Sequence, residues 1–413
     1  MNGLLFTILW FPLLGLAVSR LTGRAPIFLL GVGTCGFVLF VAGVLGAPLV
    51  PVLIVLGLAA IAVLLSRKAL ERRGLPRWSL LPGEASPAAP LFLALIPAAA
   101  LLFISAVTPL SDYDGRAFWL LKAKALAHEG VVGGPFFHGA TISPRNAYPL
   151  LLPLDGATIM LAAGELDEQH VRWLYSLIAL SFALLLGRRL QWWCAPLFLL
   201  LPQVVLMHQG SALTAYSDLA VGAFTACAFF ELLDGESPLR FGLWIAFIAM
   251  TKSEGLPLSA LLFAIGAIVF RRRIVVALAP YAIAVGTVLA WRRSVPLSDE
   301  MDFASLIRTV PQHLPQLRAC IAAIAGEFAD LQDWGVLWLA FVAAMLVLLA
   351  RREWRLPALA AAVIVPMLAL YAAVYAVSPY DLPTLSGDLA PRILTHLLGP
   401  AFAVISGAFA RSR

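Results

Sequence analysis

The sequence contains few charged residues. Only 13% of its 413 residues are Asp, Glu, Lys or Arg, whereas 61% are hydrophobic, and the mean hydropathy is +0.91. A water-soluble domain of this length needs a polar surface that this composition does not supply. Soluble enzymes and soluble binding modules are therefore excluded.

Cysteine is scarce as well, and no basic domain is present. The four cysteines have neither metal-binding nor redox spacing, so we expect no zinc site and no structural disulfide. The net charge of +6 lies mostly in short loops, which excludes nucleic acid as a partner. The first apolar run, 4–19, has no basic segment before it and no A-x-A cleavage site after it, so we expect a retained helix.

Long apolar runs make up most of the chain. A run of about 20 apolar residues crosses a bilayer as a helix, whereas membrane barrels show short alternating segments. We therefore predict an all-α polytopic membrane protein with about 13 transmembrane helices. The predicted spans are 4–19, 27–45, 49–66, 91–107, 171–187, 193–208, 213–232, 238–252, 255–270, 274–291, 334–350, 357–377 and 391–410.

The basic turns between these runs predict the orientation of the helices. With the N-terminus outside, seven basic turns fall on the cytoplasmic side, as the positive-inside rule requires. They are 20–24, 67–77, 188–189, 240, 271–273, 351–355 and 411–413. Arg292 and Arg293 are the exceptions. We predict an inner-membrane protein, of bacterial origin because the composition is rich in Ala, Leu and Arg, with its site on the periplasmic face.

Two large polar segments, 109–170 and 292–333, then lie outside. In the first we expect helices at about 115–128 and 150–163, both lying on the external membrane surface. In the second, apolar residues at helical spacing from 317 to 331 predict another interfacial helix. We divide the chain into 1–90, with three helices and a basic cytoplasmic loop, and 91–413, which carries both external segments.

A charged cluster opens the first external segment, in the stretch SDYDGRAFWLLKAK at 111–124. An Asp at a helix start is often only an N-cap worth about 1 kcal/mol, and this alternative applies to Asp112 and Asp114. The triplet DYD also matches the D-x-D pattern of enzymes that bind nucleotide sugars, but the predicted side of the membrane holds no nucleotides.

Several strings in order give the chain a family resemblance. The string DGRAFWLLKAKAL at 114–126 resembles the first external loop of bacterial GT-C class membrane glycosyltransferases, relatives of the protein O-mannosyltransferases and of the lipid A aminoarabinose transferase. Similar strings follow at 148–153 (YPLLLP), 215–220 (AYSDLA), 251–256 (TKSEGL) and 378–382 (SPYDL), the last followed by Arg392. The resemblance covers about 90–410. Thr384 and Leu385 depart from it, because an aromatic residue and a histidine usually stand there. Gly115 replaces a usual alanine, a difference we expect to matter little.

The resemblance implies an inverting transfer of a sugar from a polyprenyl-phosphate donor to a cell-envelope acceptor, which is a lipopolysaccharide, another polysaccharide or a protein. It makes Asp114 the base that deprotonates the acceptor hydroxyl. Arg392 is the leading ligand for the donor phosphate, where negative charge develops. Lys122, Lys124, Arg292 and Arg293 are weaker candidates for the same role.

Further residues complete the predicted site. Asp112, Asp218 and Glu254 are additional acidic candidates, with the alternatives that Asp218 caps a helix and Glu254 pairs with Lys252. No cofactor is required, but Asp114, Asp218 and Glu254 offer oxygen ligands for a divalent cation, so a metal site stays an open alternative. His138 and His208 fit solvated surface roles. The candidate substrate contacts are Arg116, Trp119, Tyr148, Tyr216, Lys252, Tyr380 and Asp381.

Two other functions stay open. An O-antigen ligase or polymerase uses polyprenyl-diphosphate donors, but its working loop lies late in the chain, unlike the early carboxylates here. A transporter or lipid flippase carries charges within its spans, often with inverted repeats, and neither is evident. The helices before residue 90 have no assigned motif and serve as scaffold or as partner contact.

Overall fold

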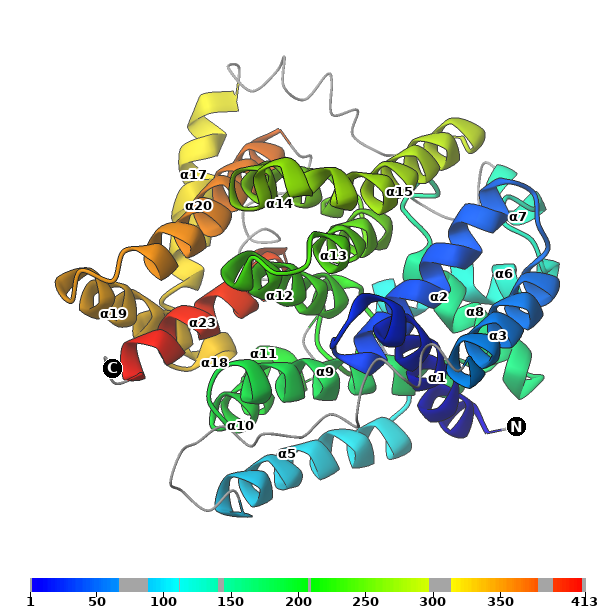
Figure 1. Cartoon of the computed structure of the whole chain (residues 1–413), viewed down its shortest axis with the longest axis horizontal. Coiled ribbons are helices and arrows are strands. Elements are labelled where there is room, and N and C mark those ends of the chain that lie inside the picture. Colours follow the sequence, from blue (N-terminus) through cyan, green and yellow to red (C-terminus); the bar gives the residue numbers. More distant parts are fainter. Residues whose placement is uncertain are drawn as a thin grey trace.

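The computed structural model describes residues 2–66, 88–110, 112–139, 145–206, 209–296, 313–377 and 389–410, and all regular elements in these ranges are helices (Figure 1). Five helical stretches there are long and apolar enough to cross a membrane. They are Gly3–Thr22, Ile27–Val44, Glu168–Arg189, Gly255–Ser294 and Arg355–Ala376. The predicted class, an all-helical membrane protein, is therefore confirmed.

The N-terminal helices pack closely on each other and on the rest of the molecule. They are α1 (Gly3–Thr22), α2 (Ile27–Val44) and α3 (Leu49–Leu65). A Cβ atom on Gly15 would lie 1.7 Å from the Ile27 carbonyl oxygen, so the two backbones touch where both helices carry small residues. The basic loop 67–77 lies outside the described residues, and α5 (Ala88–Val107) follows it.

The first polar segment contains the two predicted helices. The π-helix η1 (Gly115–Leu120) continues into α6 (Leu121–Glu129), and α7 (Pro135–His138) precedes α8 (Leu151–Ala163). Residues 151–160 of α8 are all buried, so this helix is covered by neighbouring helices of the protein. Apolar side chains occur all around this helix, and α2, α6 and α9 (Glu168–Arg189) pack against it.

Three predicted spans are interrupted. The run 193–208 forms only α10 (Cys194–Leu199) and α11 (Pro202–Val205), since Pro202 has no N–H to continue a helix. The run 213–232 begins as a turn, and α12 (Asp218–Asp234) starts five residues late. The last run is split into α22 (Ala390–Thr395) and α23 (Leu398–Phe409). Two of these breaks place polar residues beside Asp218, as described below.

In Figure 1, α12 lies near the middle of the molecule, and α23 runs from beside it toward the C-terminus at the left edge. The second polar segment contains α17 (Leu314–Glu327), in which Ile324 and Glu327 are buried but Ile321 is 53% exposed, so the predicted apolar face is only partly correct. The described helices between α12 and α22 are α13 (Pro238–Thr251), α14 (Gly255–Phe270), η2 (Arg271–Ile274), α15 (Val275–Ser294), α17 (Leu314–Glu327), α18 (Leu331–Trp334), α19 (Leu337–Ala350) and α20 (Arg355–Ala376).

The arginines of the basic turns gather at one end of α12. Arg240 pairs with Glu231 in the last turns of α12 (2.6 Å) and donates to the Thr22 carbonyl oxygen (3.2 Å). Further contacts join Arg20 to Leu64, Arg189 to Asp234, Arg273 to Gly235, Arg355 to Leu233 and Arg351 to Ala408. Asp218 begins the same helix, and its 17 residues span about 25 Å. The arginine end and the Asp218 end are thus separated by nearly a bilayer core.

Candidate functional site

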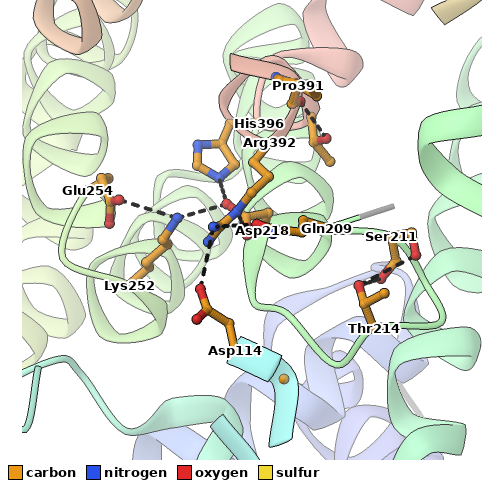
Figure 2. Close-up of polar contacts among 12 residues, drawn as sticks. Asp114, Gln209, Ser211, Thr214, Asp218, Lys252, Glu254, Pro391, Arg392 and His396 are labelled. Atoms are coloured by element: carbon orange, nitrogen blue, oxygen red, sulfur yellow. Dashed lines mark hydrogen bonds and ion pairs between the residues drawn. The ribbon is translucent and has the colours of Figure 1, made fainter. Parts of the chain in front are cut away.

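Asp218 is the centre of a buried charged network at the start of α12 (Figure 2). Its side chain is fully buried, and both oxygens accept bonds: Oδ1 from Lys252 Nζ (2.8 Å) and His396 Nε2 (3.1 Å), and Oδ2 from Arg392 Nε (3.2 Å). A helix N-terminus also favours a carboxylate through its free N–H groups. The partners come from the turn after α13 and from α22 and the residue after it.

The network extends through the two permanent cations. Lys252 also lies 3.2 Å from Glu254 Oε1, and Arg392 lies 3.8 Å from Asp114 Oδ2. The guanidinium carbon of Arg392 lies 4.4 Å from the centre of the Tyr216 ring, a cation–π contact. Its Nη1 approaches Gln209 Oε1 at 3.5 Å. Residues from 114 to 396 therefore meet at one place.

His396 is held on both sides. Because a carboxylate only accepts hydrogen bonds, Nε2 donates to Asp218, and Nδ1 lies in hydrogen-bond contact with the Tyr371 hydroxyl at 2.6 Å. His396 and Tyr371 were missed in the sequence, as was Gln209. A signal did exist for His396, since it follows Arg392 by four residues and so shares its side of a helix.

Asp114 differs from the other acids of the network. Its side chain is 34% exposed, and its contact with Arg392 is long. It makes no helix-capping hydrogen bond, whereas Asp112 accepts one from the Gly115 N–H at 3.2 Å. The capping alternative thus applies to Asp112, and Asp114 is the acid that a ligand can reach.

Three buried polar atoms around the network have no hydrogen-bond partner among the described residues. They are Ser217 Oγ, Ser253 Oγ and Glu254 Oε2, whereas the Tyr216 hydroxyl is paired with Asp112. A buried polar group left unpaired costs about 1–3 kcal/mol, so such groups in a folded protein need an explanation. Their position beside Asp218 and Lys252 suits a ligand that carries several hydroxyl groups.

The backbone beside the site is tightly constrained. A Cβ atom on Gly115 would lie 2.1 Å from the Thr214 carbonyl oxygen, so η1 touches the turn before α12. The expectation that glycine instead of alanine matters little at 115 is therefore wrong. Ala215 has φ +58°, a conformation that few residues other than glycine adopt. The close contact at Gly115 fixes where Asp114 stands relative to α12.

Other predicted residues have different partners. Arg116 and Lys124 both bind Glu168 of α9, at 2.9 and 2.6 Å, which ties η1 and α6 to that helix. Lys122 is fully buried, and its Nζ donates to the Arg145 carbonyl oxygen (2.6 Å). These three side chains hold the first polar segment together.

Three aromatic residues form a small buried cluster beside the network. Phe118, Trp119 and Tyr216 pack together, and Tyr148 packs against them. Lys122 Nζ lies 3.9 Å from the centre of the Phe118 ring. Of the predicted substrate contacts, Tyr216 thus touches the network directly, while Trp119 and Tyr148 belong to the aromatic cluster that packs with Tyr216.

The remaining predicted residues are placed as follows. Arg292 and Arg293 lie in the last turn of α15, and the partners of Asp218 and Arg392 given above do not include them. His138 is exposed and contacts the Gly133 carbonyl oxygen, in keeping with its predicted surface role. Tyr380, Asp381 and His208 lie outside the described residues, as do Thr384 and Leu385.

No protein-family model, curated protein or solved structure matches this chain. The assignment of function therefore depends on the side chains of the network and on their geometry.

Proposed function

We propose that this protein is a GT-C-like inverting glycosyltransferase, which moves a sugar from a polyprenyl-phosphate donor to a cell-envelope acceptor. The observation that carries the proposal is the convergence of residues from four of its family-like strings. Asp114, Asp218, the Lys252–Glu254 pair and Arg392 are far apart in the sequence and form one network. A network of this kind at one end of a helix bundle suits a reaction on lipid-linked substrates.

Each residue type has a role in such a transfer. When the bond between the sugar and the phosphate breaks, negative charge develops on the phosphate oxygens, and a fixed guanidinium stabilises it. Arg392 is held for this role by Asp218 and by the ring of Tyr216. Asp114 is exposed enough to accept the proton of the incoming hydroxyl. The unpartnered hydroxyls of Ser217 and Ser253 are available to the sugar.

The proposal includes the thirteen-span topology, with the network on the periplasmic face of a bacterial inner membrane. The arginine contacts support it. The five basic turns that the structure describes meet at the end of α12 opposite Asp218, about 25 Å away, as the positive-inside rule requires of cytoplasmic turns. Polyprenyl-linked sugars reach the opposite face, where the network would stand.

The test is mass spectrometry of envelope glycolipids and polysaccharides from a deletion strain. That strain is complemented with the native protein, with Asp114→Asn or with the matched control Asp234→Asn, which alters a carboxylate at the arginine end. We expect a missing sugar that the native protein and Asp234→Asn restore and Asp114→Asn does not.

Three results would count against the proposal. Full restoration by Asp114→Asn would mean that Asp114 is not the base. An unchanged set of glycans in the deletion strain would exclude the proposed transferase activity and favour a transporter or flippase. A defect in polymerised glycans that accumulates diphosphate-linked donors would favour the ligase or polymerase.

A further inference from the structure

Lys252 stands between two of the three carboxylates that the sequence offers to a divalent cation. Its Nζ lies 2.8 Å from Asp218 Oδ1 and 3.2 Å from Glu254 Oε1, and the residue is 3% exposed. Figure 2 shows the ammonium group between the two acids, with Asp114 on the other side of Arg392. The position between the carboxylate oxygens of Asp218 and Glu254 is therefore occupied by the ammonium group of Lys252.

The turn after α13 produces this placement. Lys252 ends the helix in an extended conformation (φ −153°, ψ 157°), and α14 starts three residues later at Gly255. A Cβ atom on Gly255 would lie 2.0 Å from the Ile248 carbonyl oxygen, so α14 begins directly against the end of α13. This tight reversal presents Lys252 and Glu254 to each other.

The donor set does not fit a metal ion. Mg²⁺ and Ca²⁺ bind carboxylate oxygens at about 2.0–2.6 Å and need oxygens that are not already engaged by cations. Both oxygens of Asp218 are engaged, by Lys252, His396 and Arg392. Lys252 and Arg392 already pair with the three carboxylates Asp114, Asp218 and Glu254, which weakens the attraction of the site for a further cation. Among the described residues, the groups close enough to hold a metal are Glu165–Asp167–His170 and Glu327–Asp330–Asp333, neither of which includes Asp218.

We infer that Lys252 is a built-in cation, which occupies the position between Asp218 and Glu254 where a metal-dependent site would hold its ion. Lys252 is then a positioning residue: it neutralises Asp218 and Glu254, and Asp218 holds Arg392. The anionic leaving group is stabilised by protein cations alone. This last consequence rests on the proposed function, whereas the cation-binding statement does not.

The experiment measures Mn²⁺ binding to the full-length protein in nanodiscs by electron paramagnetic resonance, without sugar substrates. The proteins are the wild type, Lys252→Ala and the matched control Lys124→Ala, which removes a lysine that pairs with Glu168 outside the network. We expect no Mn²⁺ at the network of the wild type or of Lys124→Ala. Lys252→Ala should bind one equivalent that the further change Glu254→Gln abolishes.

A second measurement replaces the lost ammonium. Ethylammonium chloride should raise the melting temperature of Lys252→Ala by about 2–4 °C relative to the same concentration of NaCl, as expected for a ligand that binds only the folded state. It should leave the wild type and Lys124→Ala unchanged. A loss of packing alone at residue 252 would not produce a response specific to ethylammonium.

The inference is overturned if the wild type binds one Mn²⁺ that Asp218→Asn or Glu254→Gln abolishes. It is also overturned if folded Lys252→Ala takes up neither Mn²⁺ nor ethylammonium. Should Lys252→Ala fail to fold, the wild-type titration with Glu254→Gln decides: Mn²⁺ bound there refutes the inference, and its absence supports it. Glycan analysis tests the transferase separately, so either idea can fail without the other.

Discussion

Replacing Gly115 by alanine tests how η1 positions Asp114. The new methyl carbon would lie 2.1 Å from the Thr214 carbonyl oxygen, and real Cβ atoms essentially never come within 3.0 Å of a neighbouring atom. The two backbones must therefore separate by about 0.9 Å, and an overpacked contact of this kind typically costs about 1–3 kcal/mol of stability. Neither partner is a flexible side chain, so no rotamer change can relieve the clash.

The expected effect on activity is larger than the effect on stability. Asp114 directly precedes Gly115, and it lies 3.8 Å from Arg392. A misplacement of about 1 Å of a catalytic group can lower the rate about 100-fold. We therefore expect kcat to fall by about this factor, with a smaller change in KM because Asp218 still holds Arg392.

The assay is sugar transfer by the purified protein in nanodiscs, followed by mass spectrometry, together with thermal unfolding. Gly286→Ala in α15 is the matched control, because a Cβ atom there would have no heavy atom within 4 Å apart from the adjacent residues and the nearby backbone of its own helix. Its activity should be unchanged, and its stability should rise by about 0.5–1 kcal/mol. Full activity and unchanged melting of Gly115→Ala would refute the role assigned to the close contact.

Three further changes test separate parts of the structure. Ala215→Gly should raise the free energy of unfolding by up to about 1 kcal/mol, because φ +58° strains a residue with a Cβ; a lower melting temperature would contradict this. Arg392→Lys keeps the charge but loses the forked geometry, so the KM for the polyprenyl-phosphate donor should rise about tenfold, and an unchanged KM would remove Arg392 as the phosphate ligand. Burial raises the pKa of Glu327 from 4.5 to about 7, although the Trp334 N–H opposes the shift. The folded state then binds more protons than the unfolded state between these values, so stability falls as the pH rises through this window, by at most about 3 kcal/mol. Glu327→Gln should flatten melting temperature against pH between about 4.5 and 7, the window of the shift, and an unaltered profile would contradict the assignment.

Local sequence determined the class of the protein and several of its helices. A composition of 61% hydrophobic residues and long apolar runs leaves no alternative to a helical membrane protein. The helices at 115–129 and 151–163 were also predictable, since helical periodicity and the Tyr148–Pro149 break are properties of adjacent residues. Asp218 and Glu254 were selected as candidates because ionisable residues are costly in a membrane protein, whereas Asp114 and Arg392 were selected through the family resemblance of the strings around them.

Only the tertiary structure decided which of these residues meet. Lys124 was a weaker candidate than Arg392 for the phosphate, and Arg116 was a candidate substrate contact, but Glu168, more than 40 residues later in the chain, pairs with both of them. The partners of a charged side chain are set by helix packing over long sequence separations, which hydropathy along the chain does not contain. The same reason explains why α8 is buried, why His396 was missed and why Lys252 stands between two carboxylates. The sequence determined which residue types and helices were available, and packing determined the site.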